Sequence, residues 1–123
     1  LSRGAKEVIF FENYKNSVKI LKKNIDLLDL SKRCKIYEQN VYQISKDRLD
    51  FKKFDLIFLD PPFDDKEVNM ILGLLITEKI IIKDTLVIIH RNSKKKEIFT
   101  KNLKIIREEK YGISKILFGK LSI

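Results

Sequence analysis

Four consecutive residues, Asp60-Pro61-Pro62-Phe63, combine a carboxylate, two rigid imino acids and an aromatic ring. The Asp60 carboxylate and the Pro61 carbonyl can accept the two N–H groups of one amine, which aims its lone pair outward. The prolines stiffen the loop, so these acceptors need little ordering. Phe63 can stack on an unpaired base. The pattern predicts chemistry at an exocyclic base amine, with all four residues catalytic and Phe63 also binding the substrate.

The elements around this motif favour that interpretation over a simple proline turn. Residues 54–59 include a continuous apolar run, which predicts a strand buried in a parallel sheet. Two prolines cannot continue the strand, so Asp60 lies at its carboxyl end, where open α/β sheets bind ligands. A helix is expected next, with a capping-box-like start at Asp64 and Glu67. Its apolar face consists of Val68, Ile71, Leu72 and Leu75.

The rest of the chain predicts alternating strands and helices. Strands are expected at residues 7–11, 35–37, 54–59 and 85–89, with helices near 14–28 and 93–101 and an irregular segment at 40–50. Residues 103–109 and 113–121 are expected to form an antiparallel hairpin. A mostly parallel α/β sheet that ends in such a hairpin is typical of the Rossmann-like class I methyltransferase fold. We expect residues 1–123 to be a single, partial domain of this kind.

A second group of residues is expected to bind a nucleoside cofactor. Glu12 ends an early strand, where Rossmann-like folds place an acid on the ribose hydroxyls. The alternative role of Glu12 is to stabilise a helix N-terminus. Asn13 is expected beside it as a helix cap and cofactor contact. Asp60 is expected to contact the cofactor as well as the substrate amine. Asn40 and Val41 follow the next strand and are expected to hold the adenine ring, although an aspartate is usual at Asn40.

Two further residues lie near the end of the strand that follows Asp60. His90 is the single histidine, and Arg91 follows it. Either can contact the substrate, Arg91 through a phosphate, but a structural or surface role is the more frequent one for such residues.

Bulk composition limits the function classes. The chain has 123 residues and a net charge of +9, which suits one domain with a polyanionic partner. Cys34 is the single cysteine, so no internal disulfide can form, and no apolar run is long enough for a membrane span. We therefore expect a cytoplasmic protein with no membrane role and no metal.

The chain resembles the bacterial 16S ribosomal RNA guanine-N2 methyltransferases. The stretches that carry the likeness are 1–5, 8–12, 54–63, 86–90, 110–112 and 117–118. The Leu-Ser-Arg-Gly-Ala start and the Tyr-Gly hairpin turn are more diagnostic than the Pro-Pro motif. The resemblance implies S-adenosylmethionine as cofactor, guanine N2 in 16S rRNA as target, and a monomer acting on partly assembled small ribosomal subunits.

Residues 1–123 differ from the pattern of this family in two respects. The family often has an acid near His90. Its first strand, glycine-rich loop and N-terminal RNA-binding extension have no counterpart in residues 1–123. In this fold that strand lies at the sheet centre, so its neighbours would expose unpaired edges. We expect these 123 residues alone to be poorly stable and to lack cofactor binding, and a full-length protein to be active.

The same residues are compatible with other functions. A DNA adenine-N6 or cytosine-N4 methyltransferase fits the same motif, whereas protein glutamine methyltransferases usually have Asn in place of Asp60. An inactive basic RNA-binding remnant of the fold is the alternative from another class. A Rossmann dehydrogenase is disfavoured by the closing hairpin.

Overall fold

The computed structural model describes residues 4–12, 14–38, 54–60, 65–93 and 102–122. They belong to two compact units, residues 1–44 and 45–123, and each unit is described by itself. The interpretation of the chain as one partial domain stays a prediction. The expected helix at 93–101, the irregular segment at 40–50 and the Asp64 cap lie almost wholly outside the described residues.

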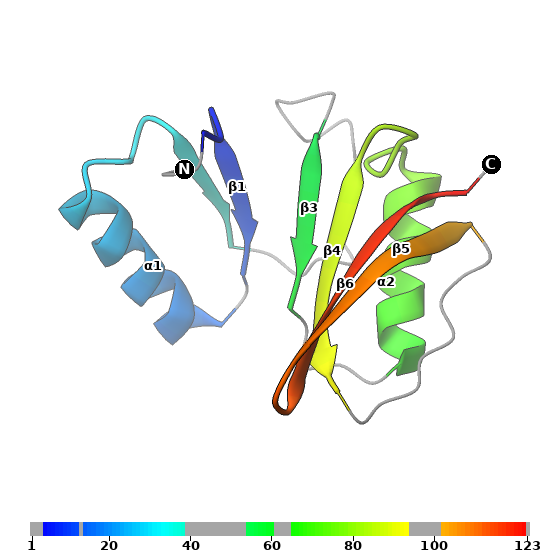
Figure 1. Cartoon of the computed structure of the whole chain (residues 1–123). Helices are drawn as coiled ribbons and strands as arrows, with labels where there is room; N and C mark the ends of the chain where they lie inside the picture. Colours follow the sequence, from blue (N-terminus) through cyan, green and yellow to red (C-terminus); the bar gives the residue numbers. More distant parts are fainter. Residues whose placement is uncertain (1–3, 13, 39–53, 61–64, 94–101, 123) are drawn as a thin grey trace. The chain divides into compact units, whose positions relative to one another are not determined.

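The first unit is a β-α-β segment made of β1 (Val8–Phe11), α1 (Lys15–Leu27) and β2 (Cys34–Tyr37) (Figure 1). The two strands are parallel, with Val8 opposite Cys34 and Phe11 opposite Tyr37. Parallel strands need a crossover, and α1 provides it. This part of the predicted topology is confirmed.

The helix of the first unit confirms only part of its expected apolar face. Val18 and Ile25 are buried, whereas Leu28 is 67% exposed. The reason is that α1 ends at Leu27 and Asp29 adopts a left-handed φ of 55°. The expectation that Asn13 caps this helix is wrong, because the N-cap residue is Tyr14 and it makes no side-chain capping bond.

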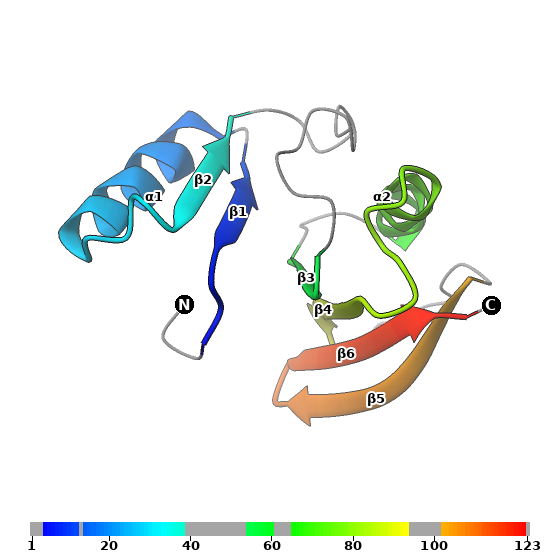
Figure 2. The same ribbon diagram turned by 90° about the horizontal axis from the view of Figure 1, so that it is seen from above.

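The second unit contains β3 (Leu56–Leu59), α2 (Asp65–Thr77), β4 (Leu86–Asn92), β5 (Leu103–Tyr111) and β6 (Ser114–Leu121). Its sheet has the order β3-β4-β6-β5. The first two strands are parallel, and β6 is antiparallel to both of its neighbours. The predicted change from parallel strands to a closing hairpin is confirmed. α2 lies on one face of this sheet (Figure 2).

The core of the second unit is formed between α2 and the sheet. The four apolar positions expected on this helix (Val68, Ile71, Leu72 and Leu75) are at most 3% exposed. Val87 and Ile89 of β4 are fully buried. Burial of these side chains fixes the face of β4 that α2 covers, and so fixes which residues of β4 point the other way.

The strand after Asp60 is longer than predicted. β4 continues to Asn92 instead of ending at Ile89, because β6 pairs with it as far as the Asn92–Ser114 pair. His90 is therefore an interior residue of β4. The hairpin turn is also tighter than predicted, and Gly112 adopts a φ of 59° there, which favours glycine.

A buried threonine fixes β4 beside β3. Thr85 is fully buried directly before β4. Its hydroxyl donates to the Phe54 carbonyl at 2.8 Å and accepts from the Ile82 amide at 3.2 Å. The Leu86 amide then donates to the Asp55 carbonyl at 2.9 Å. These bonds set the register in which Leu59 lies opposite Ile89.

Candidate active site

The carboxyl end of β3 brings two of the predicted site residues together. Asp60 directly follows Leu59, and Leu59 is opposite Ile89, so Asp60 lies beside His90. The Asp60 Oδ1 and His90 Nδ1 atoms are 2.9 Å apart. The Asp60 side chain is 61% exposed and the His90 side chain 34%. Both residues were predicted from the sequence, but their hydrogen bond was not.

Asp60 can accept a further hydrogen bond in addition to the one that it shares with His90. An ionised carboxylate has two oxygens and can accept about four hydrogen bonds. One contact goes to His90, and the exposed side chain leaves room for another donor, such as an amine. On its other side His90 has Ile116 of β6 as its cross-strand neighbour, which offers no competing hydrogen bond.

The other residues of the predicted motif are not described. Pro61, Pro62 and Phe63 lie outside the described residues, so their proposed roles in placing the amine and stacking on the base stay predictions. Asp60 is thus the member of the motif whose contacts the structure reports.

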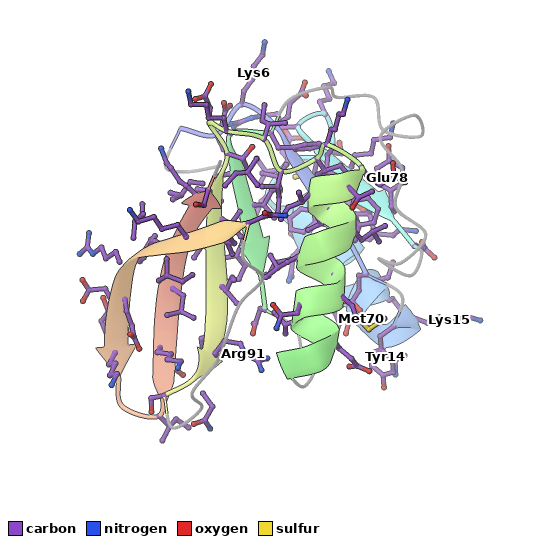
Figure 3. The ribbon with its side chains drawn as sticks, turned by 90° about the vertical axis from the view of Figure 1, so that its right-hand side faces the viewer. Lys6, Tyr14, Lys15, Met70, Glu78 and Arg91 are labelled. Carbon is purple, nitrogen blue, oxygen red and sulfur yellow. The ribbon has the colours of Figure 1, made fainter. Side chains whose placement is uncertain are left out.

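Arg91 does not share a face with His90. Alternation along β4 places Arg91 with the buried residues Val87 and Ile89, and only 6% of it is exposed. Figure 3 shows Arg91 at the same end of the sheet as the start of α2. Its neighbour in the sheet is Lys115, also 6% exposed. The predicted phosphate contact of Arg91 is not tested by this arrangement and stays a prediction.

The burial of Arg91 beside Lys115 was not predicted from the sequence. Charged side chains are seldom buried without partners, and both residues make further interactions. The available signal was the register of the hairpin. If β6 is aligned on β4 by its alternating apolar residues, Lys115 falls beside Arg91 on the α2 side.

In the first unit, Glu12 follows β1 at the carboxyl end of the two parallel strands. Its amide donates to the Tyr37 carbonyl at 3.2 Å, which continues the pairing of β1 and β2 by one residue. The Tyr14 amide donates to Glu12 Oε1 at 3.1 Å, so the half-buried carboxylate is held at the start of α1. Helix α1 has no acidic residue in its first turn, so the alternative helix-start role of Glu12 stays a prediction. The second carboxylate oxygen is left to bind a ligand.

A tyrosine beside Glu12 offers a further polar atom. Tyr37 ends β2 and stacks on Phe11, with ring centroids 5.0 Å apart. Its hydroxyl is buried, and the described residues provide no hydrogen-bond partner for it. A buried polar atom without a partner is costly. Tyr37 was not among the residues predicted from the sequence.

These observations fit a nucleoside cofactor in part. A carboxylate oriented by a backbone amide can accept hydrogen bonds from ribose hydroxyls. Asn13, Asn40 and Val41, the other expected contacts, lie outside the described residues and stay predictions.

No group of three or more histidine, cysteine or acidic residues that suits a metal ion occurs in the described part of the chain. Within the same ranges, neither helix is long and apolar enough to cross a membrane.

The strand order, the parallel β3–β4 pair and the closing hairpin define a Rossmann-like methyltransferase fold. Residues 1–120 match the family described as "Conserved hypothetical protein 95", and the chain belongs to this family. The crystal structure of the candidate methylase HI0767 of Haemophilus influenzae is similar, with a TM-score of 0.77 and 28% identity. That match covers 98% of this chain and 76% of the other.

Two curated relatives carry the name Ribosomal RNA small subunit methyltransferase D. The Haemophilus influenzae protein is 30% identical over 114 residues, which are 92% of this chain and 59% of that protein. The Buchnera aphidicola protein is 29% identical over 109 residues, which are 89% of this chain and 56% of that protein. The chain thus spans somewhat more than half the length of these relatives.

Proposed function

We propose that this protein methylates an exocyclic amine of a nucleic-acid base, namely guanine N2 of 16S ribosomal RNA, with S-adenosylmethionine as cofactor. The observation that carries the proposal is the exposed Asp60 carboxylate, held by His90 at the carboxyl end of β3. Ligands bind at this edge in open α/β sheets. The names of the relatives support an RNA substrate.

Asp60 would act on the attacking nitrogen. When bound, the cofactor supplies a methyl group already activated by its positive sulfur, so neither a metal nor a covalent enzyme intermediate is needed. The cofactor would serve as the methyl donor, with its sulfur as the leaving group of the transfer. Asp60 accepts an N–H hydrogen bond before the transfer, which directs the nitrogen lone pair, and its carboxylate can take the proton that the nitrogen then loses.

Glu12 would hold the cofactor at its ribose. The bond from the Tyr14 amide fixes the carboxylate before any ligand arrives, which lowers the ordering cost of binding. Asn13 beside it and Asn40 and Val41 after β2 would complete the nucleoside contacts. Arg91 would contribute a phosphate contact, and Phe63 would stack on the target base.

The partner we propose is the small ribosomal subunit during its assembly, met in the cytoplasm by a monomeric enzyme that needs no metal or membrane. The net charge of +9 supports a polyanionic substrate. Binding to RNA should therefore weaken as salt concentration rises.

The test is to identify the methylated atom. The protein as encoded in its genome, including any residues ahead of Leu1, is incubated with labelled S-adenosylmethionine and unmethylated small subunits, and the RNA is digested to nucleosides. The proposal expects label in N2-methylguanosine. Label in N6-methyladenine or N4-methylcytosine of a DNA substrate, with none in RNA, would replace it with a DNA methyltransferase. Cofactor binding without transfer to either nucleic acid would also overturn it.

A further inference from the structure

The hydrogen bond between His90 and Asp60 has a direction that the chemistry of the two groups fixes. The distance of 2.9 Å between His90 Nδ1 and Asp60 Oδ1 is that of an ordinary hydrogen bond. An ionised carboxylate only accepts hydrogen bonds, so the imidazole must donate, and the proton of a neutral ring must lie on Nδ1. The second ring nitrogen, Nε2, then carries the lone pair.

This bond is placed to orient Asp60, and its effect on folding should be small. Asp60 is the first residue after β3 and its side chain is 61% exposed, so packing does little to fix the carboxylate. His90 is an interior residue of β4, paired with β6 through Ile116, and its ring is the more buried of the two. Ion pairs this exposed contribute little to stability. His90, which the sheet holds in place, therefore fixes the more exposed Asp60 carboxylate.

We propose that His90 is a positioning residue, whose Nδ1–H group holds Asp60 Oδ1 so that the carboxylate faces the substrate amine. This rests on the function proposed above for Asp60. His90 would then act through Asp60 and make no direct contact with the base. The substrate-binding role expected for His90 from the sequence would be replaced by this indirect one.

Two substitutions separate this role from a general effect of removing the ring. The amide nitrogen of asparagine can occupy the position of Nδ1, so His90→Asn keeps a donor for Asp60. The longer glutamine places its amide near the position of Nε2 and loses that donor. His90→Gln and His90→Ala should each lower kcat roughly tenfold, as expected for loss of a hydrogen bond to a charged but exposed group. His90→Asn should stay within about threefold of the wild type, and KM for S-adenosylmethionine should not change in any variant.

The tautomer can be measured without any assay of activity. Because His90 is the single histidine of the 123 residues, the nitrogen–proton spectrum of the ring can be assigned by its loss in His90→Gln. At mildly alkaline pH we expect the proton on Nδ1 in the wild type and a shift toward Nε2 in Asp60→Ala. The proposal would be overturned if the wild-type ring carries its proton on Nε2, or if the position of the proton is the same in Asp60→Ala as in the wild type.

The two measurements also distinguish failure of this proposal from failure of the proposed function. If methyl transfer is found but His90→Gln is as fast as His90→Asn, His90 does not position Asp60, although the function stands. If no base amine is methylated while the Nδ1 tautomer depends on Asp60, the contact is confirmed, but both the function and the positioning role built on it fail.

Discussion

Thr85 provides a sharp test of how the second unit holds β3 and β4 in the register that brings Asp60 to His90. Thr85→Val keeps the shape of the side chain and replaces the hydroxyl with a methyl group. The Phe54 carbonyl loses a donor at 2.8 Å and the Ile82 amide loses an acceptor at 3.2 Å. Each polar group left unsatisfied costs about 1–3 kcal/mol when buried. Thr85 itself is buried, but Phe54 and Ile82 are only half-buried, so we expect the lower part of that range for each group, about 2–3 kcal/mol together.

Thr85→Ser is the matched control, because it keeps the hydroxyl and loses one methyl group. That loss should cost about 1 kcal/mol. Valine is the more apolar residue, so apolar burial alone predicts the opposite order of stability.

The assay is thermal or urea unfolding followed by far-UV circular dichroism. For a unit of this size, each 1 kcal/mol should lower Tm by roughly 4–8 °C. Thr85→Val should therefore lower Tm by about twice as much as Thr85→Ser or more. A valine variant as stable as the serine variant would refute the assignment of the two bonds.

Three other predictions concern the cofactor site and the backbone. Glu12→Gln should weaken S-adenosylmethionine binding by roughly tenfold or more in titration calorimetry, because a charged acceptor is lost. The control Glu38→Gln, at an exposed residue, should bind as tightly as the wild type. Equal affinities of the two variants would contradict the role of Glu12. Lys79 has a φ of 58° after α2, so Lys79→Gly should raise the free energy of unfolding by about 0.5–1 kcal/mol, and a decrease would contradict the assigned backbone. Gly119→Val should destabilise by about 1–3 kcal/mol in urea unfolding, since a Cβ there would lie 3.2 Å from Leu103 Cγ; an unchanged midpoint would show that the sheet relaxes.

The elements predicted correctly from the sequence are those whose bounds and buried face depend on their own apolar pattern. Elements whose ends depend on pairing with a distant strand were predicted less well. The face of α2 was read correctly because four apolar residues at helical spacing meet one sheet. β4 was predicted too short, because its apolar run stops at Ile89 while pairing with β6 continues to Asn92. The extension depends on pairing with β6, whose residues lie more than twenty positions further along the chain. A local sequence pattern carries no information about such a partner.

The sequence predicted which residues lie near the candidate site and at which strand ends. It did not predict the hydrogen bonds between them. Asp60 and His90 were selected because parallel strands end at one edge of a sheet. Their hydrogen bond depends on side-chain rotamers and on the register fixed at Thr85, neither of which local sequence patterns determine. The same limit applies to Glu12, whose bond from the Tyr14 amide depends on how the chain enters α1.

The proposed function requires that the Asp60 carboxylate acts on the substrate amine. The most direct measurement compares methyl transfer to small subunits by the wild type, Asp60→Asn and Asp84→Asn, together with the affinity of each for S-adenosylmethionine. Asp84 is an exposed carboxylate before β4, at the other end of the strand from His90, and serves as the control.

We predict that Asp60→Asn lowers kcat by roughly 10²–10³-fold, comparable to loss of one preorganised hydrogen-bonding group at a reacting centre, while cofactor affinity is kept. Asp84→Asn should transfer methyl groups at the wild-type rate. An Asp60→Asn protein that binds the cofactor and methylates as fast as the wild type would show that the Asp60 carboxylate does not act on the amine.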